Sequence, residues 1–292
     1  MDFIINELSV SGQYSSLENL INHGLIPLSS VLTTIRKYGF NSVLKKSDFW
    51  SIPLLPNQTF HELCFSPIAR TNDAIRKIKS QIASLQNEPF WDLNSEQKTN
   101  TNYYHEKDGN RNPINNSGIA ESYERQDCLI SFCEGGYNYS LLNVEAVCNQ
   151  TTDCRKVSNV WNTDILLDVL FKKNILDIPQ FIKGKFKQKL DFEEVSTSYG
   201  LNLVDATNYS TFYKSFQEFE RMTWQQIKTS DAFDYKEFKK NKKTRDYFSD
   251  DQWAKGIHKF RIDKKFRCFG YVNNQIFHVL RIDLSHKLSN KG

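Results

Sequence analysis

Two strand-like runs near the end of the chain constrain its fold more than any other feature of the sequence. Residues 265–272 and 275–283 are rich in apolar and aromatic residues, with basic and imidazole side chains among them, and both read as β-strands. Between them lie Asn273 and Asn274, and asparagine tolerates the positive φ angles of a two-residue type I′ turn. A third run, 258–263, precedes this pair. The sequence therefore predicts an antiparallel sheet of three strands at this end.

A turn at Asn273 and Asn274 determines which residues of the two strands face each other. Arg267 would lie opposite Leu280, with His278 as its diagonal neighbour. One face of the hairpin would show Arg267, Phe269, Tyr271, His278 and Leu280, and the other Phe266, Cys268, Val272, Phe277, Val279 and Arg281. The second face is more apolar and is the better candidate for the core. We therefore expect a guanidinium and an imidazole together on the accessible face.

The rest of the chain predicts a mixed fold of the α+β class. Residues 118–147 read as a helix, a buried strand, a glycine turn and a second strand. This order favours an α/β or α+β domain over residues 1–195 rather than a helical bundle. Residues 181–189 alternate apolar side chains with lysine and predict an exposed edge strand. A polar stretch, 193–209, marks a boundary, after which 205–292 forms a smaller domain with helices before its strands.

The charge of the chain is unevenly distributed. From residue 205 onward there are 18 Lys and Arg against 11 Asp and Glu, whereas the first 204 residues hold 20 against 23. A basic C-terminal part predicts that any binding of phosphate groups takes place there, although a lysine-rich surface can also be merely solvated. The lysine-rich segment 236–245 reads either as a clamp for an RNA backbone or as a soluble helix.

Composition disfavours several classes of protein. The N-terminus lacks the basic flank and apolar stretch of a signal peptide, and no run approaches the roughly 18 apolar residues of a membrane span, so we expect a cytoplasmic protein without a membrane partner. The six cysteines would then be thiols, and because their spacing differs from zinc motifs, we expect neither a metal nor a cofactor. Glu121, Glu124 and Asp127 lie three apart and are expected on one solvated helix face. The alternative is a metal–carboxylate site that these residues form with Asp2 and Glu7.

The polar residues of the predicted hairpin have the chemistry that RNA cleavage without a metal requires. Attack by a 2′-hydroxyl needs a base, a cation beside the phosphate and a proton for the leaving oxygen. Arg267 offers donors that match phosphate oxygens, and a histidine such as His278 can take or give a proton near neutral pH. Tyr271 can stack on a splayed base. The alternative is an ordinary sheet surface on which Arg and His are only solvated.

The C-terminal segment resembles the RelE/HigB-type mRNA interferase toxins over about 80 residues. The likeness lies in M-T-W-Q-Q-I at 222–227, in F-R-I-D-K-K-F-R-C-F-G-Y at 260–271, in the hairpin, and in D-L-S-H-K-L at 283–288. The resemblance implies helices packed on a small, twisted antiparallel sheet. By position, it implies that Arg267 binds the scissile phosphate and that His286 transfers a proton. The basic residues that it would use to hold RNA are His258, Lys259 and Arg261.

These observations predict a toxin-like or phage-defence effector that acts as a metal-independent endoribonuclease on mRNA. The expected catalytic residues are Arg267, His286 and His278. The expected RNA-binding residues are His258, Lys259, Arg261, Tyr271, Arg281, Lys242 and Lys243. The expected partners are mRNA, either free or on the ribosome, and a protein such as an antitoxin or an ATPase. The alternative is a non-catalytic subunit that binds nucleic acid or a partner within a defence or toxin–antitoxin complex.

Overall fold

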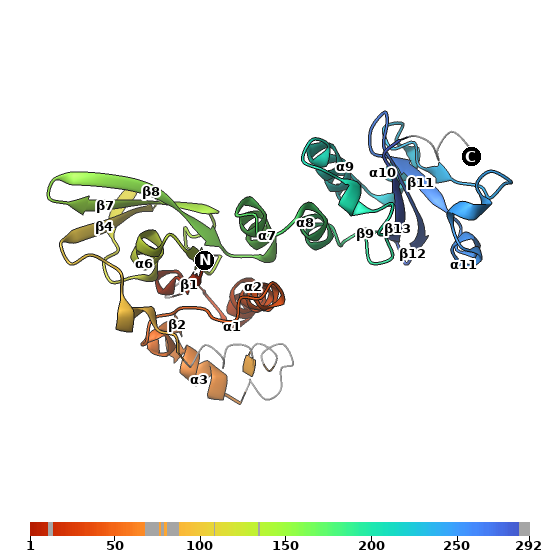
Figure 1. Cartoon of the computed structure of the whole chain (residues 1–292). Coiled ribbons are helices and arrows are strands. Elements are labelled where there is room, and N and C mark those ends of the chain that lie inside the picture. Colours follow the sequence, from red (N-terminus) through yellow and green to blue (C-terminus); the bar gives the residue numbers. More distant parts are fainter. Residues whose placement is uncertain are drawn as a thin grey trace. The chain divides into compact units, whose positions relative to one another are not determined.

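The computed structural model describes residues 1–10, 14–67, 76, 79–80, 88–107, 109–133 and 135–285. It divides into two compact units, Met1–Val169 and Leu170–Gly292, each built on a sheet of its own (Figure 1). Helices and strands are mixed in both units, in agreement with the predicted α+β class. The six cysteines, all within the described residues, form no disulfide bond with one another. None of the helices in the described residues combines the length and the apolar character that crossing a lipid bilayer requires.

The first unit is built on a mixed sheet, which in the described residues has the strand order β1-β6-β8-β7-β4-β5. Its first three strands in that order run parallel, and the other three continue the sheet in antiparallel fashion. These strands are β1 (Phe3–Ile5), β4 (Thr101–Lys107), β5 (Asn110–Pro113), β6 (Cys128–Ile130), β7 (Leu141–Cys148) and β8 (Thr151–Val160). A separate ribbon pairs β2 (Pro53–Leu55) with β3 (Gln58–Thr59).

Helix α6 (Gly118–Arg125) supplies much of the core of the first unit. The Ser117 hydroxyl caps its start by accepting a hydrogen bond from the backbone N–H of Ala120. Ile119 and Tyr123 of this helix pack with sheet residues such as Val144. The other helices of this unit in the described residues are α1 (Leu17–Asn19), α2 (Ile26–Lys37) and α3 (Phe60–Phe65), with a π-helical segment (Leu20–Leu25) between α1 and α2. Helix α7 (Thr163–Lys172) contains the boundary between the two units. The sequence predicted the order α6, β6, β7, and the structure has it.

The second unit has a sheet of strand order β10-β11-β12-β13-β9 in the described residues. It is antiparallel throughout except that β9 runs parallel to β13. The strands are β9 (Leu190–Asp191), β10 (Lys236–Glu237), β11 (His258–Arg261), β12 (Arg267–Asn273) and β13 (Ile276–Asp283). The helices are α8 (Ile178–Lys185), α9 (Tyr209–Arg221), α10 (Trp224–Thr229) and α11 (Asp250–Ala254). Phe212, Phe216 and Phe219 recur at helical spacing along α9 and bury one face of the sheet.

The second unit begins earlier in the chain than the predicted domain of residues 205–292. Most of the predicted edge strand, 181–189, is helical and belongs to α8, so this strand prediction is wrong. Asp177 and Gln180 form a reciprocal capping box at the start of α8, and this local signal outweighs the alternation of apolar residues and lysines. Ile182 of this helix packs into the core of α9 and the sheet, so the stretch predicted to precede the boundary belongs to the second unit.

The C-terminal hairpin forms, but its turn lies one residue later than predicted. Positive φ angles occur at Asn274 (49°) and Gln275 (62°), so that Asn273 pairs with Ile276. Moving a turn by one residue shifts each pairing by two positions. Because side chains alternate with a period of two, the shift changes the partners across the hairpin and preserves the faces.

A β-bulge changes the pairing again farther from the turn. The register shifts between Phe269 and Gly270, which places Arg267 opposite Asp283, whereas Tyr271 lies opposite His278. Three residue pairs therefore separate Arg267 from His278 along the hairpin, and the predicted contact between these two side chains is wrong. The bulge also brings Arg281 opposite Phe269, so Arg281 does not share the apolar face as predicted.

Candidate active site on the sheet of the second unit

The two faces of this sheet differ in character. One face packs on α9 through apolar residues such as Phe260, Cys268 and Phe277. The other face, which we call the Tyr271 face, carries the side chains that alternate with these, namely Lys259, Arg261, Arg267, Phe269, Tyr271, His278 and Arg281. Most residues that the sequence singles out therefore share one face, but they differ in exposure and in partners.

His278 is held by a carboxylate from the neighbouring strand. Its Nδ1 lies 2.8 Å from Oδ2 of Asp191, and the two residues are paired where β9 runs beside β13. Because a carboxylate oxygen accepts, the ring nitrogen donates, and in the neutral ring Nε2 then carries the free lone pair. The side chains of His278 and Asp191 are 19% and 29% exposed. His278 therefore has a fixed ring orientation at a partly open position.

Tyr271 lies beside His278 within a charged network. The two rings stack with centroids 4.7 Å apart. The Tyr271 hydroxyl donates to Oε1 of Glu194 at 2.6 Å and accepts from Nζ of Lys255 at 3.0 Å. The bond from Tyr271 holds the pKa of Glu194 below its usual value, and the bond to Tyr271 raises the pKa of Lys255. Glu194 is therefore an anion and Lys255 a cation at neutral pH, and both contact the Tyr271 hydroxyl.

The sequence predicts that Tyr271 stacks on an RNA base, but in the structure this residue is buried. Its side chain is 6% exposed, and one of its ring contacts is already His278. Burial is also the largest cause that raises the pKa of its phenol, ahead of the hydrogen bond to Glu194. Tyr271 thus positions His278 and Lys255 instead of meeting a nucleobase directly.

Arg281 is held between two tyrosine rings. Its guanidinium carbon lies 3.3 Å from the ring centroid of Tyr199 and 5.2 Å from that of Tyr247. Tyr199 comes from the chain that follows β9, and its carbonyl accepts a hydrogen bond from the N–H of Ile282. Within the residues that the structure describes, no carboxylate forms an ion pair with Arg281. Stacking leaves the edge of a guanidinium available to an acceptor, so Arg281 remains a candidate for binding phosphate.

Arg267 is largely buried, and backbone carbonyl groups hold its side chain. Its side chain is 7% exposed, and one terminal nitrogen donates to the carbonyl oxygens of Asp263 (2.6 Å) and Phe266 (2.9 Å). Burial lowers its pKa. The guanidinium thus ties the loop between β11 and β12 to the sheet. A cation held in this way is poorly placed to bind the scissile phosphate as predicted.

The remaining predicted RNA-binding residues lie apart from His278. Lys259 is 5% exposed under the ring of Phe238, 5.3 Å from its centroid. Arg261 forms an ion pair with Asp234 at 3.2 Å. Phe238 belongs to the segment 238–257, which covers the middle of the Tyr271 face through residues such as Phe248. This segment divides the predicted cationic face into a part near His278 and a part near Arg267.

The other predicted site residues, His258, Lys242, Lys243 and His286, lie in three different places. His258 lies on the opposite side of the sheet from Lys259, stacked on Tyr235 with ring centroids 5.2 Å apart, and so is separated from the other candidates. Lys242 and Lys243 are exposed on the segment 238–257. His286, predicted as a proton-transfer residue, lies outside the described residues.

Sequence reasoning missed the partners of His278, Tyr271 and Arg281. These are Asp191 for His278, Glu194 and Lys255 for Tyr271, and Tyr199 and Tyr247 for Arg281. Asp191, Glu194 and Tyr199 lie in or next to a polar stretch that reads as a boundary between domains. The parallel pairing of β9 with β13 brings that stretch to the hairpin, although Asp191 and His278 lie 87 residues apart in the chain. A local pattern carries no signal for such a pairing.

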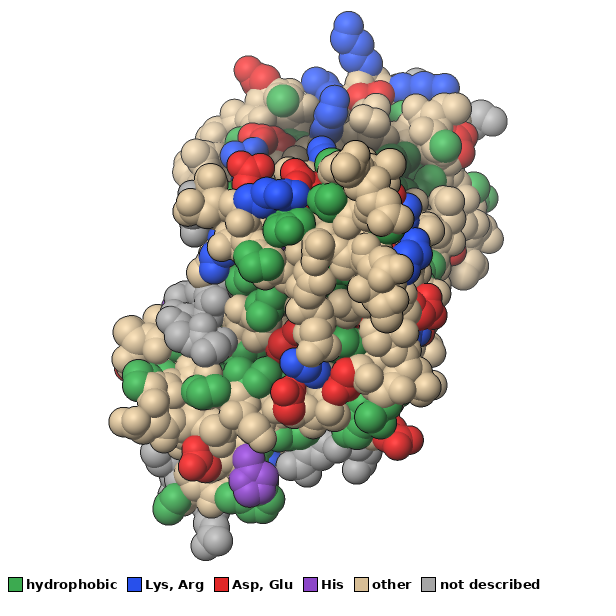
Figure 2. Space-filling model, turned by 90° about the vertical axis from the view of Figure 1, so that its left-hand side faces the viewer, with side chains coloured by type: hydrophobic (Ala, Val, Ile, Leu, Met, Phe, Trp, Pro, Cys, Tyr) green, Lys and Arg blue, Asp and Glu red, His purple; other side chains and the backbone are tan. Residues whose placement is uncertain are grey.

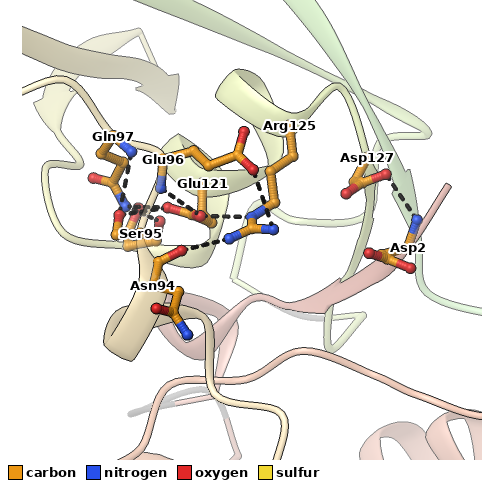
Figure 3. Close-up of polar contacts among 9 residues, drawn as sticks. Asp2, Asn94, Ser95, Glu96, Gln97, Glu121, Arg125 and Asp127 are labelled. Atoms are coloured by element: carbon orange, nitrogen blue, oxygen red, sulfur yellow. Dashed lines mark hydrogen bonds and ion pairs between the residues drawn. The ribbon is translucent and has the colours of Figure 1, made fainter.

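The acidic residues of the first unit hold structure together. The Glu121 side chain is fully buried and accepts hydrogen bonds from Ser95 Oγ (2.7 Å), the N–H of Glu96 (2.9 Å) and Nε of Arg125 (2.6 Å), as Figure 3 shows. The predicted solvated position is therefore wrong for Glu121, and the Glu124 side chain is also only 9% exposed. In the described parts of the chain, no group of three or more His, Cys, Asp or Glu side chains is arranged to hold a metal.

The surface displayed in Figure 2 carries charges of both signs. Lys and Arg side chains lie there among Asp and Glu side chains, with hydrophobic and other residues between them. Mixed charges favour solubility over the binding of a polyanion.

The chain was compared with protein-family models, with curated proteins and with solved structures, and none of the three comparisons gives a match. Its function therefore has to be inferred from its own residues.

Proposed function

We propose that the second unit cleaves single-stranded RNA without a metal and that His278 is the general base. The observation that carries this proposal is the His278–Asp191 pair beside the Tyr271–Glu194–Lys255 network. An imidazole with its Nδ1–H engaged by a carboxylate keeps Nε2 in the form that accepts a proton. A cation in the same network can stabilise the charge that develops on a phosphate.

The reaction begins when Nε2 of His278 takes the proton of an RNA 2′-hydroxyl. The freed oxygen attacks the adjacent phosphorus, and the bond from phosphorus to the 5′-oxygen of the next nucleotide breaks. Lys255 stabilises the negative charge on the phosphate and gives a proton to the leaving oxygen. The products are a 2′,3′-cyclic phosphate and a 5′-hydroxyl. Lys255 then regains a proton from water, and His278 returns its proton to water.

Arg281 and its two tyrosines extend the site along the same strand. The guanidinium can bind a neighbouring phosphate through its edge donors. Tyr199 is 45% exposed and offers part of its ring to an unpaired base. Duplex RNA hides its bases in the stack, so this arrangement favours single-stranded substrates such as mRNA. We extend the proposal to a toxin-like or phage-defence effector, because helices α9 and α10 precede three antiparallel strands here, in the order that the resemblance to mRNA interferases implies.

The test is cleavage of a fluorescent single-stranded RNA by the purified full chain in the presence of EDTA. We expect His278→Gln to lower the rate by about 10²-fold or more, because the base is lost. Asp191→Asn should lower it by about tenfold, because the ring loses its orienting carboxylate. The matched control is His258→Gln, since His258 lies on the other face of the sheet and should leave the rate within about twofold.

Two results would contradict the proposal. One is a cleavage activity that EDTA abolishes. The other is a rate that His278→Gln and His258→Gln change equally. In cells, induced expression of the wild type should arrest growth and degrade mRNA, whereas the His278→Gln variant should permit growth at the same level of protein.

A non-catalytic function is the second candidate, favoured by the burial of Arg267 and Lys259. The second unit would then bind nucleic acid through Arg281, Lys242 and Lys243, and the first unit would dock a protein partner such as an antitoxin or an ATPase. Salt-sensitive RNA binding without any cleavage would support this function. Formation of a 2′,3′-cyclic phosphate that depends on His278 would exclude it.

A further inference from the structure

Strand β8 of the first unit has one edge that the described residues leave largely open. One side of the strand pairs with β7 from Thr151 to Ser158, whereas β6 pairs with the other side at Asn159 and Val160. Residues 151–156 are all exposed. An open edge presents backbone N–H and C=O groups that another strand can pair with. The free edge of β8 is therefore a candidate for contact with a second chain.

The ladder with β7 determines which backbone groups face the free edge. The N–H of Asn159 donates to the carbonyl oxygen of Ser140, which lies just before β7. Backbone groups alternate between the two sides along a strand, and the β7–β8 register continues without a shift. The N–H and C=O groups of Thr152, Cys154 and Lys156 therefore point away from β7. Among the described residues, no hydrogen-bond partner engages these groups.

The charges beside the free edge are complementary to those of a second copy of the same strand. Asp153 and Arg155 lie on either side of Cys154, and their side chains are 52% and 45% exposed. Two antiparallel copies centred on Cys154 place each Asp153 opposite an Arg155 of the other copy. Centres at Asp153 or at Arg155 would instead place two like charges opposite each other, which is destabilising. Charge thus favours the register centred on Cys154.

We propose that the protein forms a symmetric dimer in which two β8 strands pair in antiparallel fashion about Cys154. The N–H and C=O groups of Cys154 bond to those of Cys154 in the second copy, and Thr152 pairs with Lys156 on each side. Asp153 and Arg155 form an ion pair within one copy, so two such pairs join into a network of four alternating charges. Because the contact is short, we expect a dissociation constant of about 10–100 µM. The dimer does not depend on the proposed RNA cleavage.

A proline substitution tests the backbone pairing. Cys154→Pro removes the N–H that faces the second copy and leaves the ladder with β7 intact, because this N–H points away from β7. The matched control is Cys154→Ser, which keeps the N–H. Analytical ultracentrifugation of the full chain from about 5 to about 200 µM should show a dimer for the wild type and for Cys154→Ser. Cys154→Pro should dimerise at least about tenfold more weakly, and circular dichroism reports whether it is folded.

An exchange of charges tests the register and decides the matter if the proline variant does not fold. Asp153→Arg and Arg155→Asp each place like charges opposite each other, so each should weaken the dimer by about tenfold or more. The double variant restores opposite charges and should dimerise within about threefold of the wild type. Three results would overturn the proposal: a monomer at every concentration, equal dimerisation of Cys154→Pro and Cys154→Ser, or a double variant no stronger than the single ones.

Discussion

Arg267 donates hydrogen bonds to the backbone carbonyls of Asp263 and Phe266 and so ties the loop between β11 and β12 to the sheet. Arg267→Met keeps most of the apolar stem and leaves these carbonyls without their donor. We expect it to lower the free energy of unfolding by about 1–3 kcal/mol. Urea denaturation measures this loss. The RNA cleavage rate per folded molecule should stay within a few-fold of the wild type.

The Arg267 result separates two roles. An unchanged free energy of unfolding together with a loss of cleavage comparable to that of His278→Gln would return Arg267 to the phosphate-binding role that the sequence suggested. A less stable but active variant would assign it to the fold.

Glu7 is the residue from which we predict a dependence of stability on pH. Its side chain is buried, and both carboxyl oxygens accept from the N–H of Gly118, at 3.0 and 3.1 Å. Burial raises its pKa from 4.5 to about 7. Between these two values the folded state binds more protons than the unfolded state, so the free energy of unfolding falls as pH rises. The stabilisation from this group is complete below about pH 4.5 and is lost above about pH 7.

A Glu7→Gln variant removes this titration. The free energy of unfolding of the variant minus that of the wild type should increase by on the order of 2 kcal/mol from pH 5 to pH 8. The reason is that only the wild type carries a buried charge at the higher pH. Chemical denaturation at the two pH values measures the difference, and any constant effect of the amide cancels. Parallel pH profiles of the two proteins would contradict the assignment.

At the scale of elements, the β12–β13 bulge depends on Gly270. A Cβ at this position would lie 2.0 Å from the carbonyl oxygen of His278, on the paired strand. Gly270→Ala must therefore push the strands apart, and we expect a loss of about 1–3 kcal/mol in the free energy of unfolding. RNA cleavage should also fall, because His278 moves away from Asp191. Val272→Ala, at an exposed position of the same strand, is the control and should change neither property appreciably.

At the scale of the whole molecule, the two units have separate hydrophobic cores. We therefore expect two unfolding transitions in differential scanning calorimetry. At pH 8, Glu7→Gln should move only the transition of the first unit, and Gly270→Ala only that of the second. A single transition that both substitutions shift equally would mean that the units unfold together.

The separate cores also allow the RNA site to be assigned to a unit. Single-stranded RNA should raise the transition temperature of the second unit alone, because a ligand stabilises the unit whose folded form it binds. Calorimetry with RNA therefore assigns the Tyr271 face to its unit without the need to divide the chain.

The sequence by itself determined the α+β class, the three C-terminal strands and the alternation that puts Lys259, Tyr271 and His278 on one face. Strand alternation has a period of two residues and can be read locally. The turn lies at Asn274 and Gln275, one residue later than predicted. Glutamine accepts positive φ less readily than asparagine does, so the packed hairpin and not the local preference sets the position of the turn.

Only the tertiary structure decided which side chains are in contact. Parallel pairing of β9 with β13 brings Asp191 to His278, and packing of the segment 238–257 brings Lys255 to Tyr271 and buries Lys259. The bulge and the β11–β12 loop together assign Arg267 to backbone carbonyls. These contacts join residues distant in the chain, and their energy comes from burial and long-range pairing, which local patterns of sequence do not record.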